Sequence, residues 1–194
     1  MEKMNLVNEK KHLRKRLKAW RKKQSAAAVK QKSNLIVSQL LSWHILNQAK
    51  TVFCYVSLAD EVDTHFLLKQ LIELKKRVAV PKIVGPGKMK PVILRSFSDL
   101  TAADYGILTS RSNEFLEDKI DLNLLPAAAV DLAGRRLGMG GGFYDRFIEL
   151  YQPQLNTALV FAGQVLDFVP ADKFDRLMDV IITEEKIYEI SHLK

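Results

Sequence analysis

The stretch Arg135-Arg136-Leu137-Gly138-Met139-Gly140-Gly141-Gly142-Phe143-Tyr144-Asp145-Arg146 carries four glycines in five positions. The apolar run Leu124–Val130 before it predicts a buried strand, and the apolar spacing over residues 147–151 predicts a helix after it. A strand, a glycine-rich bend and a helix in succession are typical of α/β proteins. This stretch therefore predicts an α/β fold.

Glycines at such a bend leave backbone N–H groups unshielded by side chains, next to the positive end of the helix dipole. Both features favour a phosphate chain, and Arg135, Arg136 and Arg146 add charged donors on either side. No Lys-Ser or Lys-Thr follows the glycines, so the bend is not a Walker A loop, and it lies too far along the chain for the usual dinucleotide motif. The local prediction is a nucleotide polyphosphate site. The alternative is a glycine-rich turn that only reverses the chain.

Strand and helix patterns alternate along the rest of the chain. Helices are expected at residues 5–23, 25–46 and 64–75, with Ser25 as the cap of the second. Strands are expected at residues 52–56, 78–81, 91–97, 157–162 and 180–183, with a flexible loop at 83–90 and an irregular connection at 99–121. Strands separated by helices predict an α/β fold of three layers, in which a mainly parallel sheet is flanked by helices.

Composition limits the classes of protein. The chain has 194 residues, enough for one domain or a compact pair, and 47% of them are hydrophobic, enough for a real core. The single cysteine, Cys54, excludes an internal disulfide and sits in an apolar run that predicts a buried strand residue. No segment has the length of a membrane span, and the polar N-terminus has no signal-type apolar stretch, so we expect a soluble, cytoplasmic protein.

Positive charge is concentrated in the first 32 residues. They hold 12 Lys or Arg and 2 Asp or Glu, a balance of +10, whereas the remaining residues balance at −2. Leu13, Leu17 and Trp20 recur at helical spacing and give this cationic helix one apolar stripe. Three interpretations remain open: a solvated helix face, a surface for nucleic acid or membrane, and a lid that supplies Lys and Arg to an anionic ligand.

Two further segments carry polar residues. Ser57–Thr64 follows the first expected strand, where open parallel sheets bind their ligands. Asp63 or Thr64 could cap the next helix, which leaves Glu61 freer to contact a ligand. Residues 169–179 cluster three aspartates before the last strand, for which a plain acidic turn is the default. The four histidines are scattered, so neither a zinc site nor a Ser-His-Asp triad has support.

Asp145 raises an electrostatic problem, because a carboxylate beside a phosphate cradle repels the phosphates unless a cation lies between them. Mg²⁺ is the usual solution, held by one or two carboxylates together with phosphate oxygens. Residues 172–179 could supply a second carboxylate if their segment lies beside the glycine loop. The alternative is that Asp145 only complements the dipole of its helix.

These segments together resemble the 5-formyltetrahydrofolate cyclo-ligase family, whose members are also called methenyltetrahydrofolate synthetases. The resemblance runs over nearly the whole chain in the same order, and the glycine loop is its most specific part. The matching segments are Lys10-Lys11-His12-Leu13-Arg14, Val56-Ser57 with Glu61-Val62-Asp63-Thr64, Val80-Pro81-Lys82, Pro126 with Asp131 and Gly134, Arg136–Arg146, and Val169-Pro170 with Asp175 and Asp179.

The resemblance implies a single domain over residues 1–194, related in fold to the ribose-phosphate isomerase and coenzyme A transferase group. It implies a ligase that forms a C–N bond. With ATP and Mg²⁺, such an enzyme closes 5-formyltetrahydrofolate, with or without a polyglutamate tail, to 5,10-methenyltetrahydrofolate through a phosphorylated formyl (imidate) intermediate, and it releases ADP and phosphate. We expect a monomer that binds neither nucleic acid nor membrane. The alternatives are a non-catalytic module that binds ATP and folate, and a nucleic-acid-binding protein led by the basic N-terminal helix.

The resemblance also assigns roles to residues. Those that it implies for ATP are Lys10, Lys11, His12, Leu13, Arg14, Arg136, Leu137, Gly138, Met139, Gly140, Gly141, Gly142, Phe143 and Tyr144. Those that it implies for the folate are Val56, Glu61, Met139, Gly140, Gly141, Gly142 and Phe143. It implies Asp145 and Asp175 as Mg²⁺ ligands, and Arg136 and Asp145 as the catalytic pair.

Overall fold

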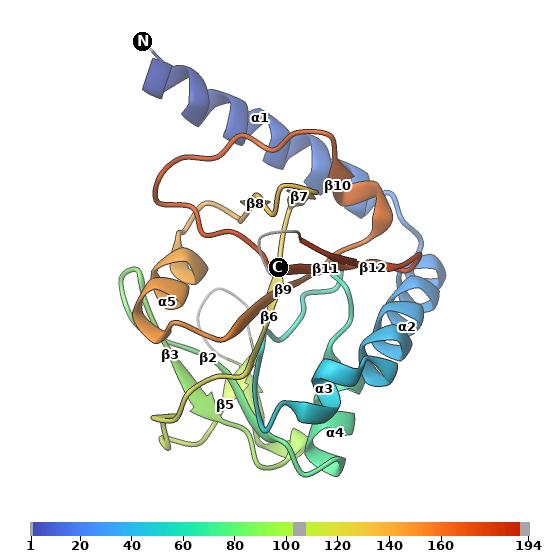
Figure 1. Cartoon of the computed structure of the whole chain (residues 1–194), viewed down its shortest axis with the longest axis vertical. Coiled ribbons are helices and arrows are strands. Elements are labelled where there is room, and N and C mark those ends of the chain that lie inside the picture. The colour runs from blue at the N-terminus through green and yellow to red at the C-terminus, as the bar shows by residue number, and fades with distance from the viewer. Residues whose placement is uncertain (1, 103–107, 191–194) are drawn as a thin grey trace.

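A seven-stranded sheet runs through the middle of the computed structural model, which describes residues 2–102 and 108–190 (Figure 1). Five neighbouring strands are parallel, and the strand at each edge is antiparallel to its neighbour. In spatial order the strands are β12 (Ile187–Glu189), β11 (Val180–Ile182), β9 (Leu155–Leu159), β6 (Leu122–Pro126), β1 (Thr51–Cys54), β2 (Arg77–Gly85) and β3 (Lys88–Ile93). The prediction of a mainly parallel sheet is confirmed.

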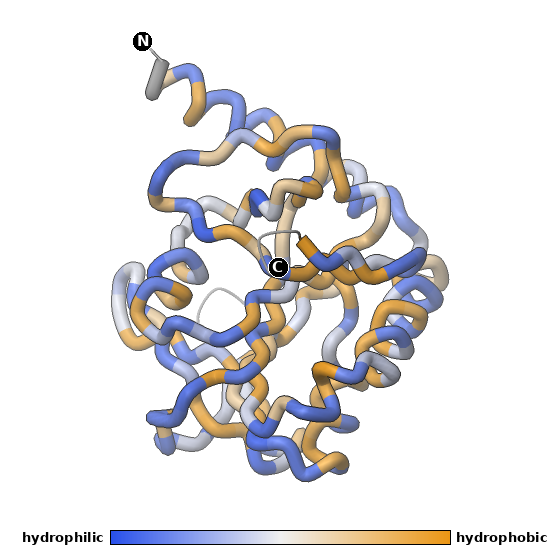
Figure 2. Tube along the Cα trace, viewed as in Figure 1, coloured by the Kyte–Doolittle hydropathy of each residue, from blue (hydrophilic) through white to orange (hydrophobic). Residues whose placement is uncertain are grey.

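Alternate residues of the central strands face opposite sides of the sheet, as the pleat requires. In β1, Val52 and Cys54 pack with helices α2 (Ala26–Ser42), α3 (His44–Gln48) and α4 (His65–Glu73). Phe53, between them, packs against Phe147 of helix α5 (Phe143–Tyr151) on the other face. The sheet is therefore covered on both faces, which explains why its central strands are buried and mostly apolar (Figure 2). The three layers that we expected are present.

Local chemistry sets the helix boundaries. The Ser25 side chain accepts a hydrogen bond from the Ala28 N–H at 3.2 Å and caps α2, as predicted. The single helix expected at residues 25–46 is wrong, because the backbone becomes extended at Trp43 and the chain continues as α3.

Two other expectations from the sequence are also wrong. Residues 83–90 are not a flexible loop, because β2 and β3 pair there as an antiparallel hairpin whose turn includes Gly87 at φ +67°. Residues 124–130 are not one strand, because β6 ends at Pro126 and the next residues join a second, small sheet. That sheet consists of β10 (Val165–Leu166), β7 (Ala129–Asp131) and β8 (Arg136–Leu137), and the glycine loop leads from β8 into α5.

The connection after β3 has some regular structure in its described part. It contains a 3₁₀ turn, η1 (Phe97–Asp99), followed by the paired strands β4 (Leu100–Ala102) and β5 (Leu108–Ser110). The expected irregular segment also includes residues 103–107, which lie outside the described residues. A further 3₁₀ turn, η3 (Ala162–Gln164), follows β9.

Helix α1 (Glu2–Lys22) lies across one end of the molecule, beside the small sheet (Figure 1). Its Leu17 is buried in a cluster with residues of β7, β8 and the segment after β10. Trp20 packs on Gly163 so closely that a Cβ there would lie 2.4 Å from the indole ring. The predicted apolar stripe thus holds the cationic helix in place. Among the helices of residues 2–102 and 108–190, none is both long and apolar enough to cross a bilayer.

Candidate active site

A cavity of about 850 Å³ opens where the carboxyl ends of β1 and β6 meet the buried side of α1. Tyr55 and Val56, directly after β1, and Pro126, the last residue of β6, line it. The chain leaves β1 toward β2 on one side of the sheet, and the strands after β6 add on the other side. Such a switch in strand order leaves a crevice in which open parallel sheets bind ligands.

Most of the residues that the resemblance singled out come together around this cavity. Those that line it are Lys10, Arg14, Val56, Glu61, Arg136, Gly138, Met139, Gly140, Gly141, Gly142, Phe143, Tyr144, Asp145 and Asp175. They come from α1, the end of β1, the glycine loop and the segment before β11, so segments distant in sequence supply one wall each.

Four of the singled-out residues do not line the cavity. Lys11 and His12 are exposed on α1, because a helix turns side chains directly after Lys10 away from the buried face. Leu13 and Leu137 pack together in the apolar cluster that anchors α1. Whether Lys11 and His12 contact a ligand stays a prediction.

The glycine loop is held from two sides by arginines that donate to its carbonyl groups. Arg14 Nε donates to the Gly138 oxygen at 2.8 Å, and Arg146 Nη2 donates to the Gly141 oxygen at 2.6 Å. Gly140 and Gly142 have φ of +102° and +63°, where side chains are strained. The carbonyl groups of the loop thus accept hydrogen bonds from the arginines, and its glycines have no Cβ atoms. This arrangement favours backbone N–H groups that remain accessible from the cavity.

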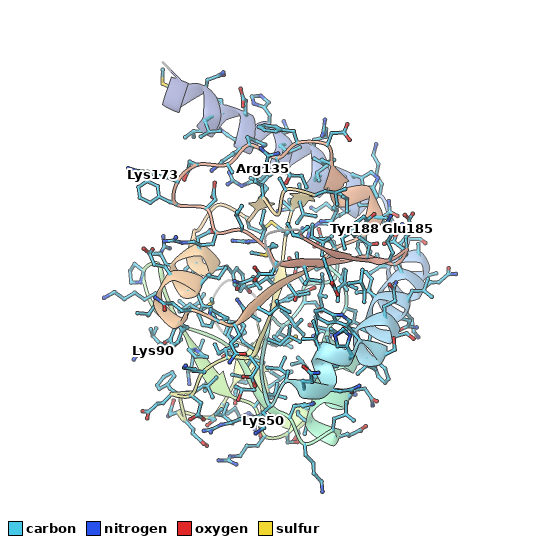
Figure 3. All side chains as sticks on the ribbon, viewed as in Figure 1. Lys50, Lys90, Arg135, Lys173, Glu185 and Tyr188 are labelled. Carbon is cyan, nitrogen blue, oxygen red and sulfur yellow. The ribbon has the colours of Figure 1, made fainter. Side chains whose placement is uncertain are left out.

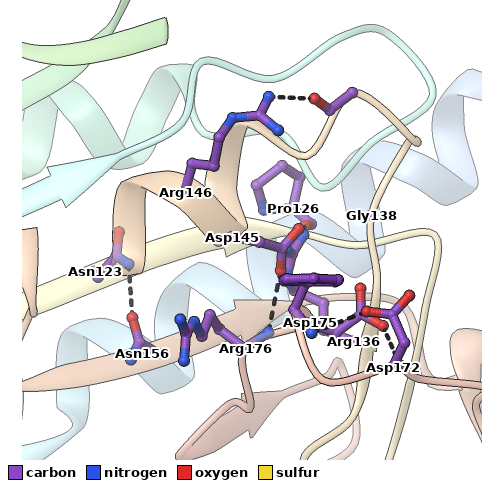
Figure 4. A network of polar contacts seen from close by, with 12 residues as sticks. Asn123, Pro126, Arg136, Gly138, Asp145, Arg146, Asn156, Asp172, Asp175 and Arg176 are labelled. Carbon is purple, nitrogen blue, oxygen red and sulfur yellow. Dashed lines mark hydrogen bonds and ion pairs between the residues drawn. The ribbon is translucent and has the colours of Figure 1, made fainter. Parts of the chain in front are cut away.

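Arg136 lies under the loop and is only 2% exposed. Its Nη2 donates to Asp145 Oδ1 at 2.8 Å, and its Nη1 donates to the Pro126 oxygen at 3.4 Å (Figure 4). The same Asp145 oxygen accepts the Arg176 N–H at 3.2 Å. Residues 172–179 therefore lie beside the start of α5, next to the glycine loop, as a second carboxylate at this site requires.

The turn before β11 is more than an acidic turn. Lys10 of α1, 7% exposed, donates to Asp172 Oδ2 at 2.7 Å and also to Asp175 Oδ2. Burial works against the charge of Lys10, but the hydrogen bonds that it donates to the two carboxylates, together with their negative charges, outweigh burial and raise the pKa of Lys10. The hydrogen bond with Lys10 in turn lowers the pKa of Asp172. Lys10, Asp172 and Asp175 thus form a charged cluster at the cavity wall.

Glu61 is 7% exposed and lines the same cavity, in the segment that follows β1. Burial raises its pKa, and the charge of its carboxylate is supported by the Leu58 N–H at 3.0 Å and by Arg21 of α1 at 3.6 Å. Arg21 also pairs with Asp60 at 3.2 Å. A buried, partly compensated carboxylate at a cavity wall can accept hydrogen bonds from a polar ligand group.

The cavity also contains residues to which the sequence analysis gave no ligand role. Tyr55 could have been found, since it stands at the end of a strand whose carboxyl edge was expected to bind ligands. Pro81 and Pro126 lie in segments that match the family, but no role was implied for them. The others had no local signal, because their packing depends on the tertiary fold. They are Val7, Leu58, Ile83, Met89, Thr109, Glu149 and Phe174.

Two residues from segments that the sequence analysis did point to also line the cavity. They are Arg146, expected as a charged donor, and Asp172, one of the clustered aspartates.

The parallel sheet, the cavity at the carboxyl ends of its strands and the cationic glycine loop define an α/β protein that can hold a small anionic ligand. Residues 6–184 match the 5-formyltetrahydrofolate cyclo-ligase family. The chain belongs to this family and is a ligase.

Individual relatives agree with this assignment. A 5-formyltetrahydrofolate cyclo-ligase of Mycolicibacterium smegmatis is 32% identical over 145 residues, which cover 71% of this chain and 75% of the relative. One of Escherichia coli strain K12 is 26% identical over 160 residues, which cover 78% and 87%. The NMR structure of Aquifex aeolicus 5,10-methenyltetrahydrofolate synthetase superposes with a TM-score of 0.85 at 27% identity, over 94% of this chain and 93% of that one.

Proposed function

We propose that the chain closes 5-formyltetrahydrofolate to 5,10-methenyltetrahydrofolate in a reaction that depends on ATP and Mg²⁺. The observation that supports this most is the convergence of Lys10, Arg14 and Arg136 on one cavity with the glycine loop. Three cationic side chains and the N–H groups of the loop can bind the negative charge of a triphosphate. Membership of the cyclo-ligase family supports a folate as the second ligand. Binding two ligands in one cavity is what a transfer of phosphate between them requires.

In this proposal the triphosphate lies along the glycine loop, at the N-terminal end of α5. Gly142 is the N-cap of α5, and no side chain from the described residues caps it. The amides of the first turn are then free to donate to phosphate oxygens, while Arg14 and Arg136 add charge. Lys10 and Arg14 line the cavity from α1, which supports the interpretation of this cationic helix as a lid that supplies charge to an anionic ligand.

The folate is proposed to lie deeper, against Val56, Glu61 and Phe143. Val56 is 4% exposed, and Met89, on the β2–β3 hairpin, adds a second buried apolar surface. Glu61 accepts hydrogen bonds from the polar edge of the pterin-like ring. An apolar floor with one carboxylate is the kind of surface that orients a flat ring with polar edges.

The chemistry divides into two steps. The formyl oxygen attacks the γ-phosphorus, the bond to the ADP oxygen breaks, and the formyl carbon becomes an activated imidate. N10 then attacks that carbon and loses its proton, the C–O bond breaks, and phosphate leaves. The protein contributes position and charge: Arg136 stabilises the transferring phosphoryl group, and Asp145 fixes the orientation of Arg136.

Asp145 and Asp175 fit as ligands of Mg²⁺. In the hydrogen bonds among the described residues, Asp145 uses Oδ1 and Asp175 uses Oδ2, so each carboxylate keeps a second oxygen for a hard cation. Within residues 2–102 and 108–190 no three His, Cys, Asp or Glu side chains form a metal group. The remaining ligands would therefore come from phosphate and water, and the metal would neutralise charge on the triphosphate.

We propose a monomer of one domain that acts in the cytoplasm, accepts folate with or without a polyglutamate tail, and shares its fold with the ribose-phosphate isomerase and coenzyme A transferase group. The non-catalytic alternative predicts ligand binding without turnover. The nucleic-acid alternative predicts binding by the exposed lysines of α1.

The test is an absorbance assay for methenyltetrahydrofolate formed from 5-formyltetrahydrofolate, with ATP and Mg²⁺ present together, singly or not at all. We expect product only when both are present. A folded sample that binds both ligands but forms no product would support the non-catalytic alternative instead.

A further inference from the structure

Four large apolar side chains line the cavity although they are exposed. Leu58, at 42%, follows β1, and the other three belong to α1, the glycine loop and the turn before β11. Val7 of α1 is 60% exposed, Met139 of the glycine loop 50%, and Phe174 of the turn before β11 64%. Exposed apolar side chains that gather at a cavity are typical of a surface that a ligand covers. They are separate from the buried floor, which Val56 and Met89 help to form.

Each of the three stands beside a charged group that we assign to the phosphates. Val7 lies one helical turn before Lys10 on α1. Met139 follows Gly138, whose carbonyl group accepts the Arg14 bond. Phe174 precedes Asp175, which Lys10 contacts, and its own N–H donates to Asp172 Oδ1 at 2.9 Å, so the turn that carries the ring is fixed.

The two apolar parts of the cavity come from different elements. Met89, on β3, packs in the cluster of Phe147 of α5, whereas Phe174 belongs to the turn that Lys10 of α1 contacts. Figure 3 labels Lys90 on β3 and Lys173 in that turn. Lys10 and Arg14 lie on the Phe174 side, since Lys10 contacts Asp172 and Asp175 and Arg14 contacts Gly138. The glycine loop reaches from there to the β2–β3 hairpin, where Arg146 donates to both Gly141 and Gly87. A ligand with phosphates on these cations therefore meets Phe174, and a second ligand can occupy the floor.

We propose that the nucleobase of the triphosphate stacks on Phe174, with Val7 and Met139 closing around it. This inference rests on the proposed function, which places a nucleotide in the cavity. A planar heteroaromatic ring suits a Phe side chain, because stacking removes both surfaces from water while the polar ring edge stays solvated. The pterin ring is assigned to the floor, where Glu61 lies.

The experiment compares two ligands that share their phosphates and differ in the base. Calorimetry gives the affinity of the full chain for a non-hydrolysable ATP analogue and for inorganic tripolyphosphate, each with Mg²⁺. The variants are Phe174→Ala and Phe174→Trp. The matched control is Phe168→Ala, since Phe168 is 59% exposed and lies over Arg135 rather than at the cavity.

We expect Phe174→Ala to weaken the ATP analogue about tenfold and to leave tripolyphosphate unchanged. Phe174→Trp should retain the affinity for the analogue, and Phe168→Ala should change neither ligand. Equal losses for both ligands would show that the ring only shapes the turn, and unchanged affinities would show that it contacts nothing; either result overturns the proposal.

Two other outcomes are distinguishable. If Phe174→Ala weakens 5-formyltetrahydrofolate and not the ATP analogue, the folate ring occupies this position and the proposal is wrong, although the proposed function stands. If the wild-type chain binds tripolyphosphate as tightly as the ATP analogue, the base contributes no affinity, and only this proposal fails. If the folded wild-type chain binds neither phosphate ligand, the proposed function fails with it.

Discussion

Helices α4 and α5 both begin near the carboxyl edge of the sheet, but their N-terminal ends differ. At α4, Asp63 accepts the His65 N–H at 2.9 Å, and the N-cap Thr64 exchanges hydrogen bonds with Ser57 at 3.0 Å in both directions. At α5 the N-cap is Gly142, in the left-handed region and without a side-chain cap. At α4, side chains thus accept bonds from the Thr64 and His65 N–H groups, although the Thr64 side chain does not itself cap the helix, whereas no side chain of the described residues caps α5. We call the start of α4 the closed end and the start of α5 the open end.

The difference explains why one end is a binding site and the other is structural. Every helix begins with N–H groups that lack partners in the helix itself. Where Ser, Thr or Asp side chains supply the acceptors, no ligand is needed. Where glycines stand instead, and Arg14 and Arg136 lie close by, an anion is the natural acceptor. The comparison therefore predicts that substitutions at the start of α5 impair ligand binding or turnover, whereas matched substitutions at the start of α4 do not.

The largest expected effect is at the open end. Asp145→Asn should lower turnover by about 10²-fold or more, because Arg136 loses the carboxylate that orients it and a metal ligand loses its charge. Stability should also fall, by about 1–3 kcal/mol, since Arg136 is buried. The control is Asp63→Asn at the closed end. The measurement is the steady-state rate of each variant over a range of Mg²⁺ concentrations. Equal rates for the wild type and Asp145→Asn would show that Asp145 has no role in catalysis.

The next effect concerns α1. Arg14→Ala should weaken the ATP analogue by about ten- to hundredfold, because a half-buried guanidinium contributes a charged hydrogen bond and holds the glycine loop. Arg16→Ala, an exposed position two residues on, should have no effect. Calorimetric titration measures both. If the two variants bind alike, the helix is a solvated face, and a titration with duplex DNA should follow.

These effects bear on how much the sequence could predict. The central strands β1, β2, β9 and β11 and the glycine loop were predictable, because apolar runs and glycine clusters are local signals. The short strands of the two small sheets were not, because two or three residues carry too little pattern. The β2–β3 hairpin was not, because its Pro86-Gly87 turn lies among Lys and Gly residues that also suit a loop. The contact of Lys10 with Asp172 and Asp175 joins opposite ends of the chain, and only the fold brings such residues together.

A smaller effect is expected at the closed end. Asp63→Ala should lower the free energy of unfolding by roughly 1 kcal/mol, the usual cost of losing a capping acceptor, and should leave ATP affinity unchanged. Urea unfolding monitored by circular dichroism gives the first quantity. A loss of ATP affinity as large as that of Arg14→Ala would contradict the division between the two ends.

The same residue gives a pH dependence. The hydrogen bond with His65 lowers the pKa of Asp63 below its ordinary 3.8, so the stability that it contributes is present above that value and is lost as pH falls through the lower, folded pKa. A carboxyl NMR titration should show Asp63 protonating below pH 3.8 in the wild type and closer to it in His65→Ala. An ordinary pKa in both would show that the pair does not form in solution.

The most direct test observes the two helix ends in one sample. Backbone amide NMR spectra are recorded as a non-hydrolysable ATP analogue is added with Mg²⁺. We predict large, saturable shifts for the amides of Gly138, Gly140, Gly141 and Gly142, and little change for those of His65 and Phe66 at the start of α4. Shifts at α4 without shifts in the glycine loop would contradict the assignment of the triphosphate to the open end of α5.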